Sequence, residues 1–110
     1  MLREDALADG GSPQATLIGS GERVTAKQAA LVNGAASHAL DYDDVVLAMS
    51  GHPSVPVWPA LLALAEWRGG SARDVLAAFV AGFEMESRIG MLVMPADMQG
   101  RLRAGLAGVP

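Results

Sequence analysis

Two local signals that begin helices constrain the fold of this chain more than any other feature of its sequence. In a capping box, a Ser or Thr side chain accepts a hydrogen bond from the backbone three residues later, and the side chain of that later residue reaches back. Thr25 and Gln28 form one such pair. Ser71 and Asp74 form another, with Asp in the place of the usual Glu. The sequence therefore predicts helices that begin near residues 26 and 72.

Apolar residues after the second capping signal repeat with the period of a helix. Leu76, Phe79, Val80 and Phe83 lie at positions i, i+3, i+4 and i+7, which is the spacing of one buried helical stripe. We expect Gly90 to end this helix, because glycine is the residue most often found just past a helix C-terminus.

The first predicted helix runs from Ala26 to about Asp41. Its middle, residues 33–37, has unusually small side chains, and a glycine inside a helix costs about 0.5 to 1 kcal/mol relative to alanine. Small residues there indicate that another helix or a ligand comes close. A further helix is predicted to begin with Ser54 as its cap and to stop at Gly69.

The N-terminal part of the chain is predicted to be irregular or extended. Residues 1–14 are polar and expected to be flexible, with a turn that ends any helix begun at 2–7. A short apolar run at 15–18 precedes a glycine-rich turn at 19–22, which indicates a small hairpin or extended arm. Beyond the last long helix, a short one through Leu102 and Leu106 is expected.

The composition favours helices. Hydrophobic residues make up 51% of the 110 residues but aromatic residues only 5%, so Ala, Leu and Val supply most of the apolar content. Ala and Leu are strong helix formers. The sequence therefore predicts a mostly α fold of three to four helices with a short N-terminal extended arm or hairpin, within one domain that occupies residues 15–110.

Several classes of protein are excluded by charge and residue usage. The net charge is -4, and the eight basic residues are scattered, so no basic face is expected to bind nucleic acid. The chain has no cysteine for disulfides or thiolate chemistry. The longest apolar stretch, 55–65, contains two prolines and falls short of the roughly 20 residues that span a bilayer. Because acidic residues stand where a secretory signal carries basic ones, we expect a cytoplasmic protein.

Reactive side chains gather in one region, and the residues alone leave its role open. If the helix continues to Asp41, that residue and His38 share a face, whereas Asp43 lies on a different one. Carboxylates at a helix C-terminus meet the unfavourable end of its dipole, so local folding does not explain them. His38, Asp41 and His52 could bind a metal as two imidazoles and a carboxylate. In the other interpretation the acids are only solvated, and His52 packs locally.

The sequence over roughly residues 10–90 resembles the MmgE/PrpD family, which includes 2-methylcitrate dehydratase and cis-aconitate decarboxylase. A small-residue helix is followed by an Asp-aromatic-Asp-Asp motif and a His-Pro-Ser motif. The segments that carry the resemblance are 14–19, 29–44, 51–54, 59–66 and 70–84.

The resemblance implies part of a larger, mostly helical domain in a homodimeric lyase that acts on small polycarboxylic acids and needs neither metal nor cofactor. Carried over by motif, His52 is the catalytic acid or base and Asp41 the carboxylate that orients it. Asp44 is a candidate substrate-binding residue. Histidine suits this chemistry because its ordinary pKa, near 6.5, lets it move a proton at neutral pH. The expected reaction is dehydration of 2-methylcitrate or a related step.

Three departures from the family weaken the prediction of activity. Val45 stands where members often have a threonine. The full enzymes are several times longer, and after Gly90 the second histidine motif and the substrate-binding lysines have no counterpart; Lys27 is the one lysine here. A polyanion bound without cations is costly to bury. We therefore expect a fragment that is inactive alone and oligomeric through exposed apolar faces. The alternative is a non-enzymatic helical interaction module or a relic of that fold.

Overall fold

The computed structural model of the chain describes residues 1–47, 49–94, 100 and 104. The fold predicted from the sequence, mostly α with a small hairpin, is confirmed over these residues. The helix predicted through Leu102 and Leu106 lies outside them. The described elements are α1 (Leu2–Asp9), β1 (Ala15–Thr16), β2 (Arg23–Val24), α2 (Ala26–His38), α3 (Ser54–Arg68) and α4 (Ala72–Val93).

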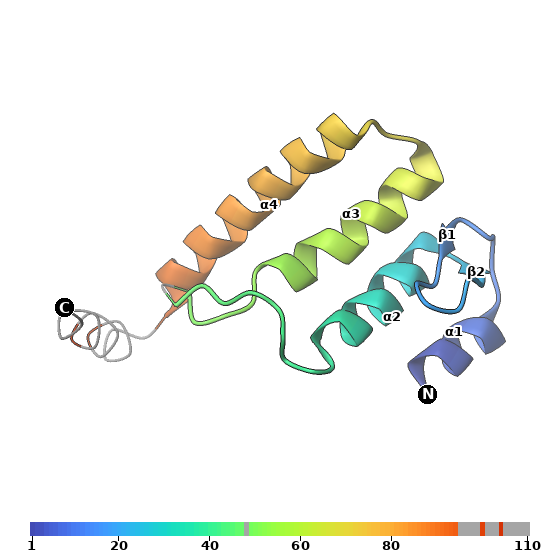
Figure 1. Cartoon of the computed structure of the whole chain (residues 1–110), viewed down its shortest axis with the longest axis horizontal. Coiled ribbons are helices and arrows are strands. Elements are labelled where there is room, and N and C mark those ends of the chain that lie inside the picture. Colours follow the sequence, from blue (N-terminus) through green and yellow to red (C-terminus); the bar gives the residue numbers. More distant parts are fainter. Residues whose placement is uncertain (48, 95–99, 101–103, 105–110) are drawn as a thin grey trace.

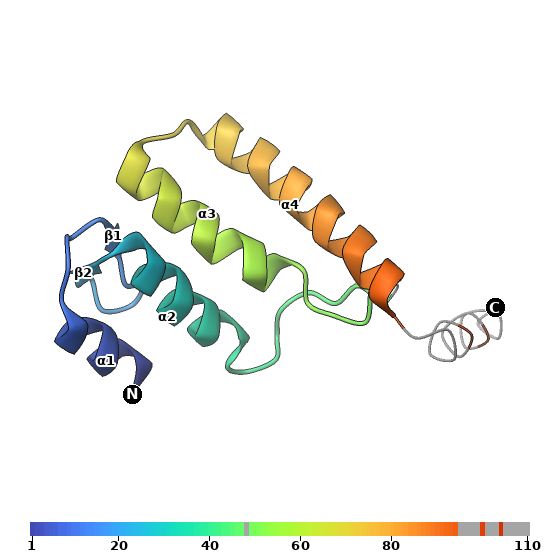
Figure 2. The ribbon, with the colours of Figure 1, turned by 180° about the vertical axis from the view of Figure 1, so that it is seen from behind.

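The helices lie side by side in chain order, with α3 between α2 and α4 (Figure 1). Helices α2, α3 and α4 alternate in direction, which Figure 2 shows from behind. Residues 39–53, here called the connector, leave the end of α2, extend toward the C-terminal end of α4 and return to begin α3. The connector carries most of the reactive side chains named above. No helix within the described residues is both long and apolar enough to cross a bilayer.

Both predicted capping boxes are present. The N–H of Gln28 donates to the hydroxyl of Thr25 at 3.3 Å, and the N–H of Thr25 donates to the Gln28 side chain at 3.0 Å. The N–H of Asp74 donates to the hydroxyl of Ser71 at 3.2 Å, and the Asp74 carboxylate accepts from the Ser71 N–H. Local sequence therefore determines where α2 and α4 begin.

The core lies where the hairpin meets α2 and α3. Strands β1 and β2 pair antiparallel, as the apolar run and the glycine-rich turn predicted. The buried cluster is small because its members are mostly short side chains; it contains Ala15, Leu17, Val24, Ala29 and Ala63.

Two polar side chains hold the hairpin onto the helices. Asn33 of α2 accepts from the N–H of Ile18 and donates to the carbonyl of Thr16, both at 3.0 Å. Glu66 of α3 accepts from the N–H of Thr16 at 2.8 Å and also pairs with Arg23. Asn33 is 7% exposed, so its hydrogen bonds replace water that the buried amide has lost. The sequence indicated only that this side chain is small.

The N-terminal segment contains a helix. Gly10, with φ of 67°, ends α1 as the predicted turn requires. Gln28 of α2 donates to the carbonyls of Ala6 at 3.0 Å and Gly10 at 3.3 Å, which satisfies acceptors near the end of α1. That residues 1–14 are flexible stays a prediction.

The small residues of α2 face α3, as expected. A Cβ added at Gly34 would lie 3.9 Å from Cγ of Pro59 and 4.0 Å from the carbonyl oxygen of Val55. Pro59 has no N–H, so the Val55 carbonyl four residues earlier lacks its usual helical donor. The two helices are therefore in ordinary contact, and the space beside them forms the pocket described below.

Two predicted boundaries around the connector are wrong. Helix α2 ends at His38 rather than near Asp41, because Asp41 has φ of 55° and cannot continue a right-handed helix. Pro53 occupies the cap position of α3, and Ser54 is its first residue. The N–H of Ser54 donates to Asp44 at 3.2 Å, so a carboxylate from the connector replaces the predicted serine cap.

Two predictions about α4 are also wrong. Gly90 lies inside the helix, which continues to Val93. A Cβ added at Gly90 would be 2.6 Å from Cβ of Met49, so glycine is needed there for the connector to approach. The predicted stripe is only half covered: Phe79 packs edge-on against Trp58 of α3, whereas Leu76 is 56% exposed. Part of the stripe is exposed because a single neighbouring helix covers less than its full width.

Candidate functional site

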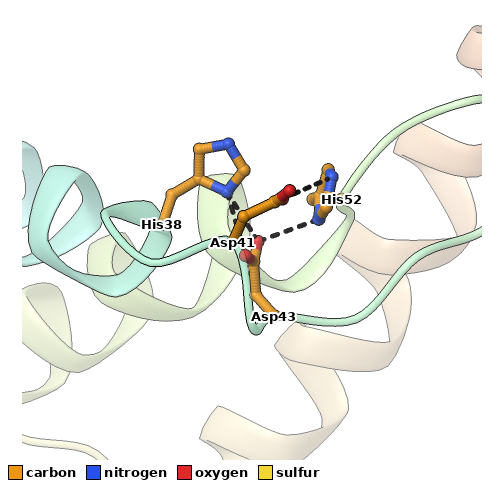
Figure 3. A group of neighbouring side chains, drawn as sticks. All are labelled: His38, Asp41, Asp43 and His52. Carbon is orange, nitrogen blue, oxygen red and sulfur yellow. Dashed lines mark hydrogen bonds and ion pairs between the residues drawn. The ribbon is translucent and has the colours of Figure 1, made fainter.

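Four reactive side chains meet where the connector leaves α2 and returns to α3 (Figure 3). His38 is the last residue of α2, Asp41 and Asp43 belong to the outgoing segment of the connector, and His52 precedes the start of α3. These four residues are called the acid–histidine cluster below.

Asp43 lies between the two imidazoles. Its Oδ1 is 2.9 Å from Nδ1 of His38, and its Oδ2 is 3.2 Å from Nδ1 of His52. The ring centroids of His38 and His52 are 4.7 Å apart, and the rings are inclined at 65°. Only 10% of the Asp43 side chain is exposed, so the carboxylate is largely enclosed by these two partners.

The predicted pair of His52 and Asp41 is also brought together. Nε2 of His52 lies 3.5 Å from Oδ1 of Asp41, whose side chain is 77% exposed. Aspartate tolerates the left-handed backbone conformation better than most residues, and this turn at Asp41 directs the following residues back toward His38.

The prediction that Asp43 lies apart from His38 is wrong, because it assumed a helix that continues past residue 38. The catalytic pair predicted from the sequence therefore included neither His38 nor Asp43. The one signal in the sequence was the five-residue spacing of His38 and Asp43 across the end of a helix. That spacing indicates a contact only once the turn at Asp41 is known.

Asp43 and His38 change each other's protonation. The hydrogen bond with Asp43, and then its negative charge, raise the pKa of His38 above 6.5. Burial acts to raise the pKa of Asp43, but its hydrogen bonds and the nearby histidines outweigh burial and lower it below 3.8. At neutral pH Asp43 is therefore a carboxylate that favours the charged form of His38.

Asp44 faces the start of α3. Its Oδ1 accepts from the N–H of Ser54 at 3.2 Å, and its Oδ2 accepts from the hydroxyl of Ser54 at 2.8 Å. A carboxylate at a helix N-terminus is stabilised by the helix dipole. Asp44 therefore fixes the position of Ser54, and with it the approach of His52 two residues earlier.

The rest of the connector is closed by a backbone pairing. Val46 and Gly51 form an antiparallel bridge, in which the N–H of Val46 donates to the carbonyl of Gly51 at 2.9 Å. On α4, Glu86 has a buried Oε2 atom without a hydrogen-bond partner among the described residues. Burial, and then the charge of Asp44, raise the pKa of Glu86 above 4.5.

A pocket of about 480 Å³ lies beside the cluster, between α2 and α3. Its lining is apolar except for the two histidines, and among the described residues it contains no Lys or Arg. The pocket is open to solvent, and the side chains of His38 and His52 are 50% and 28% exposed. The lining residues are Ala30, Leu31, Gly34, Ala35, His38, His52, Val55, Pro56 and Ala60.

The fold and the site together define a class: a helical domain in which histidines supported by carboxylates border an apolar pocket, an arrangement suited to proton transfer. A family model described as the MmgE/PrpD N-terminal domain matches residues 1–110. The chain therefore belongs to the MmgE/PrpD family, as the sequence motifs indicated.

Two curated relatives are similar to the chain. It is 33% identical over 93 residues to the cis-aconitate decarboxylase-like protein oryM of Aspergillus oryzae, a match that covers 78% of this chain and 19% of the relative. It is 41% identical over 71 residues to the cis-aconitate decarboxylase of Homo sapiens, covering 61% of this chain and 15% of that relative. The chain thus spans less than a fifth of the length of either. No solved structure matches it significantly.

Proposed function

We propose that this chain provides the acid–histidine portion of a lyase site for small polycarboxylic acids. The proposed reactions are dehydration of 2-methylcitrate and the related decarboxylation of cis-aconitate. The main support is the 3.5 Å approach of His52 Nε2 to Asp41 Oδ1 beside an apolar pocket, in a chain of the MmgE/PrpD family. Both similar relatives carry cis-aconitate decarboxylase in their names.

In this proposal His52 moves the proton and Asp41 orients the imidazole. In a dehydration, His52 removes a proton from the carbon next to a carboxylate, and the electron pair forms the double bond as the C–O bond of the neighbouring carbon breaks. The hydroxyl group leaves as water with a proton from the imidazolium of His52. In a decarboxylation, His52 donates a proton to the carbon that loses carbon dioxide. An oriented general acid or base contributes about 10²- to 10⁴-fold to the rate.

Asp44 is proposed to serve substrate binding through Ser54. Both carboxylate oxygens of Asp44 accept from Ser54, so its effect on a substrate passes through the position of the His-Pro-Ser segment. The cations that pair with the substrate carboxylates are proposed to come from residues outside this segment, in a cytoplasmic homo-oligomer. A polyanion in an apolar pocket needs such cations to offset its desolvation.

A chimera tests the proposal. The matching segment of the human cis-aconitate decarboxylase is replaced by this chain, and release of carbon dioxide from cis-aconitate is measured. His52→Gln is expected to lower turnover by about a hundredfold or more, and Asp41→Asn by about tenfold. Glu84→Gln is the matched control, because Glu84 is 61% exposed and pairs with Arg88 four residues on.

An active chimera whose turnover is unchanged by His52→Gln would remove the assignment. If the chimera does not fold, as judged by circular dichroism, the chain is supplied as a separate polypeptide to the human enzyme lacking that segment. Restored activity in that mixture supports the proposal. Loss of that activity with His52→Gln identifies His52 as the residue that moves the proton.

The exposed apolar surface of α4 favours a second candidate, a helical interaction module without catalysis. Leu76, Val80 and Ile89 are 52 to 60% exposed, and Leu92 is 82% exposed. Apolar residues repeated along one exposed helix are typical of a surface that another protein covers. Sedimentation of the chain alone tests this: a monomer at all concentrations argues against self-association through α4.

A further inference from the structure

We infer that the pocket between α2 and α3 receives an alkyl substituent of the substrate. The preferred substrate class is then polycarboxylic acids that carry a linear alkyl group longer than a methyl group. The inference rests on the proposed lyase function and narrows its substrate class. The pocket has a volume of about 480 Å³, and its lining includes His52, the residue proposed to move the proton.

The lining of the pocket suits hydrocarbon and not carboxylates. Apart from the two imidazoles, the lining residues that the structure describes are Ala, Leu, Gly, Val and Pro, whose side chains offer no hydrogen bond. A carboxylate among them would lose water without gaining a partner, which is costly. The part of the substrate that lies in this pocket is therefore apolar, and its carboxylates lie on another side of His52.

The charges beside the pocket lead to the same conclusion. Nδ1 of His38 is already 2.9 Å from the Asp43 carboxylate, and Nε2 of His52 is 3.5 Å from Asp41. Two acids thus lie next to the imidazoles that face the pocket, and like charges at such distances repel. A carboxylate of the substrate is disfavoured there, whereas a neutral alkyl group is not.

Small residues on both helices make the pocket long enough for several carbons. Gly34 and Ala35 contribute to it from α2, and Ala60 contributes from α3. Along α2 the lining runs from Ala30 to His38, a separation of about 12 Å at 1.5 Å per residue. This length exceeds that of a methyl group, so the pocket accommodates a longer linear substituent.

The lining is exposed apolar surface that a ligand can remove from water. Leu31 is 61% exposed, and Ala35, Pro56 and Ala60 are also exposed. Each methylene group that is transferred from water to such a surface strengthens binding by about fourfold. The affinity of the pocket should therefore rise with the length of the alkyl group until the pocket is filled.

The position of the pocket links alkyl binding to turnover. Because His52 belongs to the lining, a substituent held between α2 and α3 keeps the carbon that bears it near the imidazole. Holding a reacting carbon next to a general acid or base raises the rate as well as the affinity. A longer alkyl group is therefore expected to raise kcat/KM.

The first test measures binding of neutral alcohols to the whole chain, because these probes require neither a cation nor turnover. The chain is titrated with 1-propanol, 1-butanol and 1-hexanol while the NMR signals of the His38 and His52 rings are followed. We expect the dissociation constant to fall about fourfold for each added methylene group.

Two variants fill the pocket, one from each helix. Ala35→Leu and Ala60→Leu should each weaken binding of 1-hexanol by about tenfold, which is the effect of nearly two methylene groups. Both alanines are exposed, so a longer side chain meets no buried neighbour. Ala36→Leu is the matched control, because Ala36 is the next residue of α2, is also exposed and does not line the pocket.

The second test uses the chimera with the human enzyme. Its kcat/KM for release of carbon dioxide is compared between cis-aconitate and the derivative that carries an n-propyl group in place of the hydrogen on the alkene carbon. The derivative should be favoured by at least about tenfold. Ala35→Leu should lower this ratio by about tenfold, and Ala36→Leu should leave the ratio unchanged.

The two tests separate this inference from the lyase proposal. A dissociation constant that does not depend on chain length would overturn the inference, as would unchanged 1-hexanol binding in both pocket-filling variants once circular dichroism shows them to be folded. An active chimera that does not favour the propyl derivative would also overturn it, since another segment of the longer protein then covers the pocket. An inactive chimera beside length-dependent binding would instead overturn the lyase proposal and leave the apolar site in place.

Discussion

The carboxylate of Asp43 lies 3.2 Å from Nδ1 of His52, nine positions later in the chain, and at the same time contacts His38. This contact makes Asp43 the centre of the cluster, although the family motif pointed to Asp41. Asp43 is enclosed and Asp41 is exposed, so the two acids differ in their surroundings and should differ in the effect of their removal.

Replacing Asp43 by Asn should lower the pKa of His38 toward 6.5, because the hydrogen bond and charge that raise it are lost. The stabilisation that this pair gives the fold is fully present below 6.5 and is lost as the pH rises through the higher pKa of folded His38. An NMR titration of the His38 ring measures the change, with Asp9→Asn as control. A midpoint that does not move would show that Asp43 does not govern His38.

Replacing Asn33 by Ala should lower the free energy of unfolding by about 2 kcal/mol, because the N–H of Ile18 and the carbonyl of Thr16 each lose a buried partner. Ser37→Ala is the matched control on the same helix, since its hydroxyl donates to the Asn33 carbonyl within α2. Urea denaturation of both variants provides the comparison. Equal stabilities would mean that Asn33 does not hold the hairpin.

Two glycines inside helices should respond in opposite directions to alanine. Gly34→Ala should raise stability by about 0.5 to 1 kcal/mol, because the added Cβ meets Pro59 at an ordinary 3.9 Å. Gly82→Ala should lower it by about 1 kcal/mol, because the Cβ would be 2.7 Å from Cγ1 of Val57, a side chain with little rotational freedom. Thermal melts of the pair measure the difference, and a loss of stability at both positions contradicts the contact between α2 and α3.

Replacing Glu86 by Gln should stabilise the fold at neutral pH. Burial, and then the charge of Asp44, raise the pKa of Glu86 above 4.5, so folding disfavours its ionised form. A carboxyl with a raised pKa contributes stability below its ordinary pKa and loses it as the pH rises through the folded value. The gain of Glu86→Gln should therefore be largest at pH 7 and shrink toward pH 4. Denaturation midpoints at several pH values measure it.

The features of the fold that depend on neighbouring residues could be predicted from the sequence. The capping boxes at Thr25 and Ser71 gave the starts of α2 and α4, since each involves residues only three apart. The role of Gly90 could not be predicted in this way. Its neighbour is Met49, more than forty positions earlier, and only the packed connector shows that a side chain there would collide.

The candidate site was predictable to a similar extent. Its region and the pairing of His52 with Asp41 followed from the clustered residue types and the family motif. The position of Asp43 could not be predicted, because a single left-handed residue, Asp41, reverses the direction of the chain. The left-handed conformation of Asp41 depends on the path of the connector in the folded chain, and spacing rules for helices do not describe that path.

The bridge between Val46 and Gly51 separates the connector into a base, which bears the acids and His52, and a tip beyond the bridge. Insertions or deletions in the tip leave the separation of acid and imidazole unchanged, since the paired backbone sets that separation. Homologous chains are therefore free to differ in length between these two residues while they keep the same arrangement at the base.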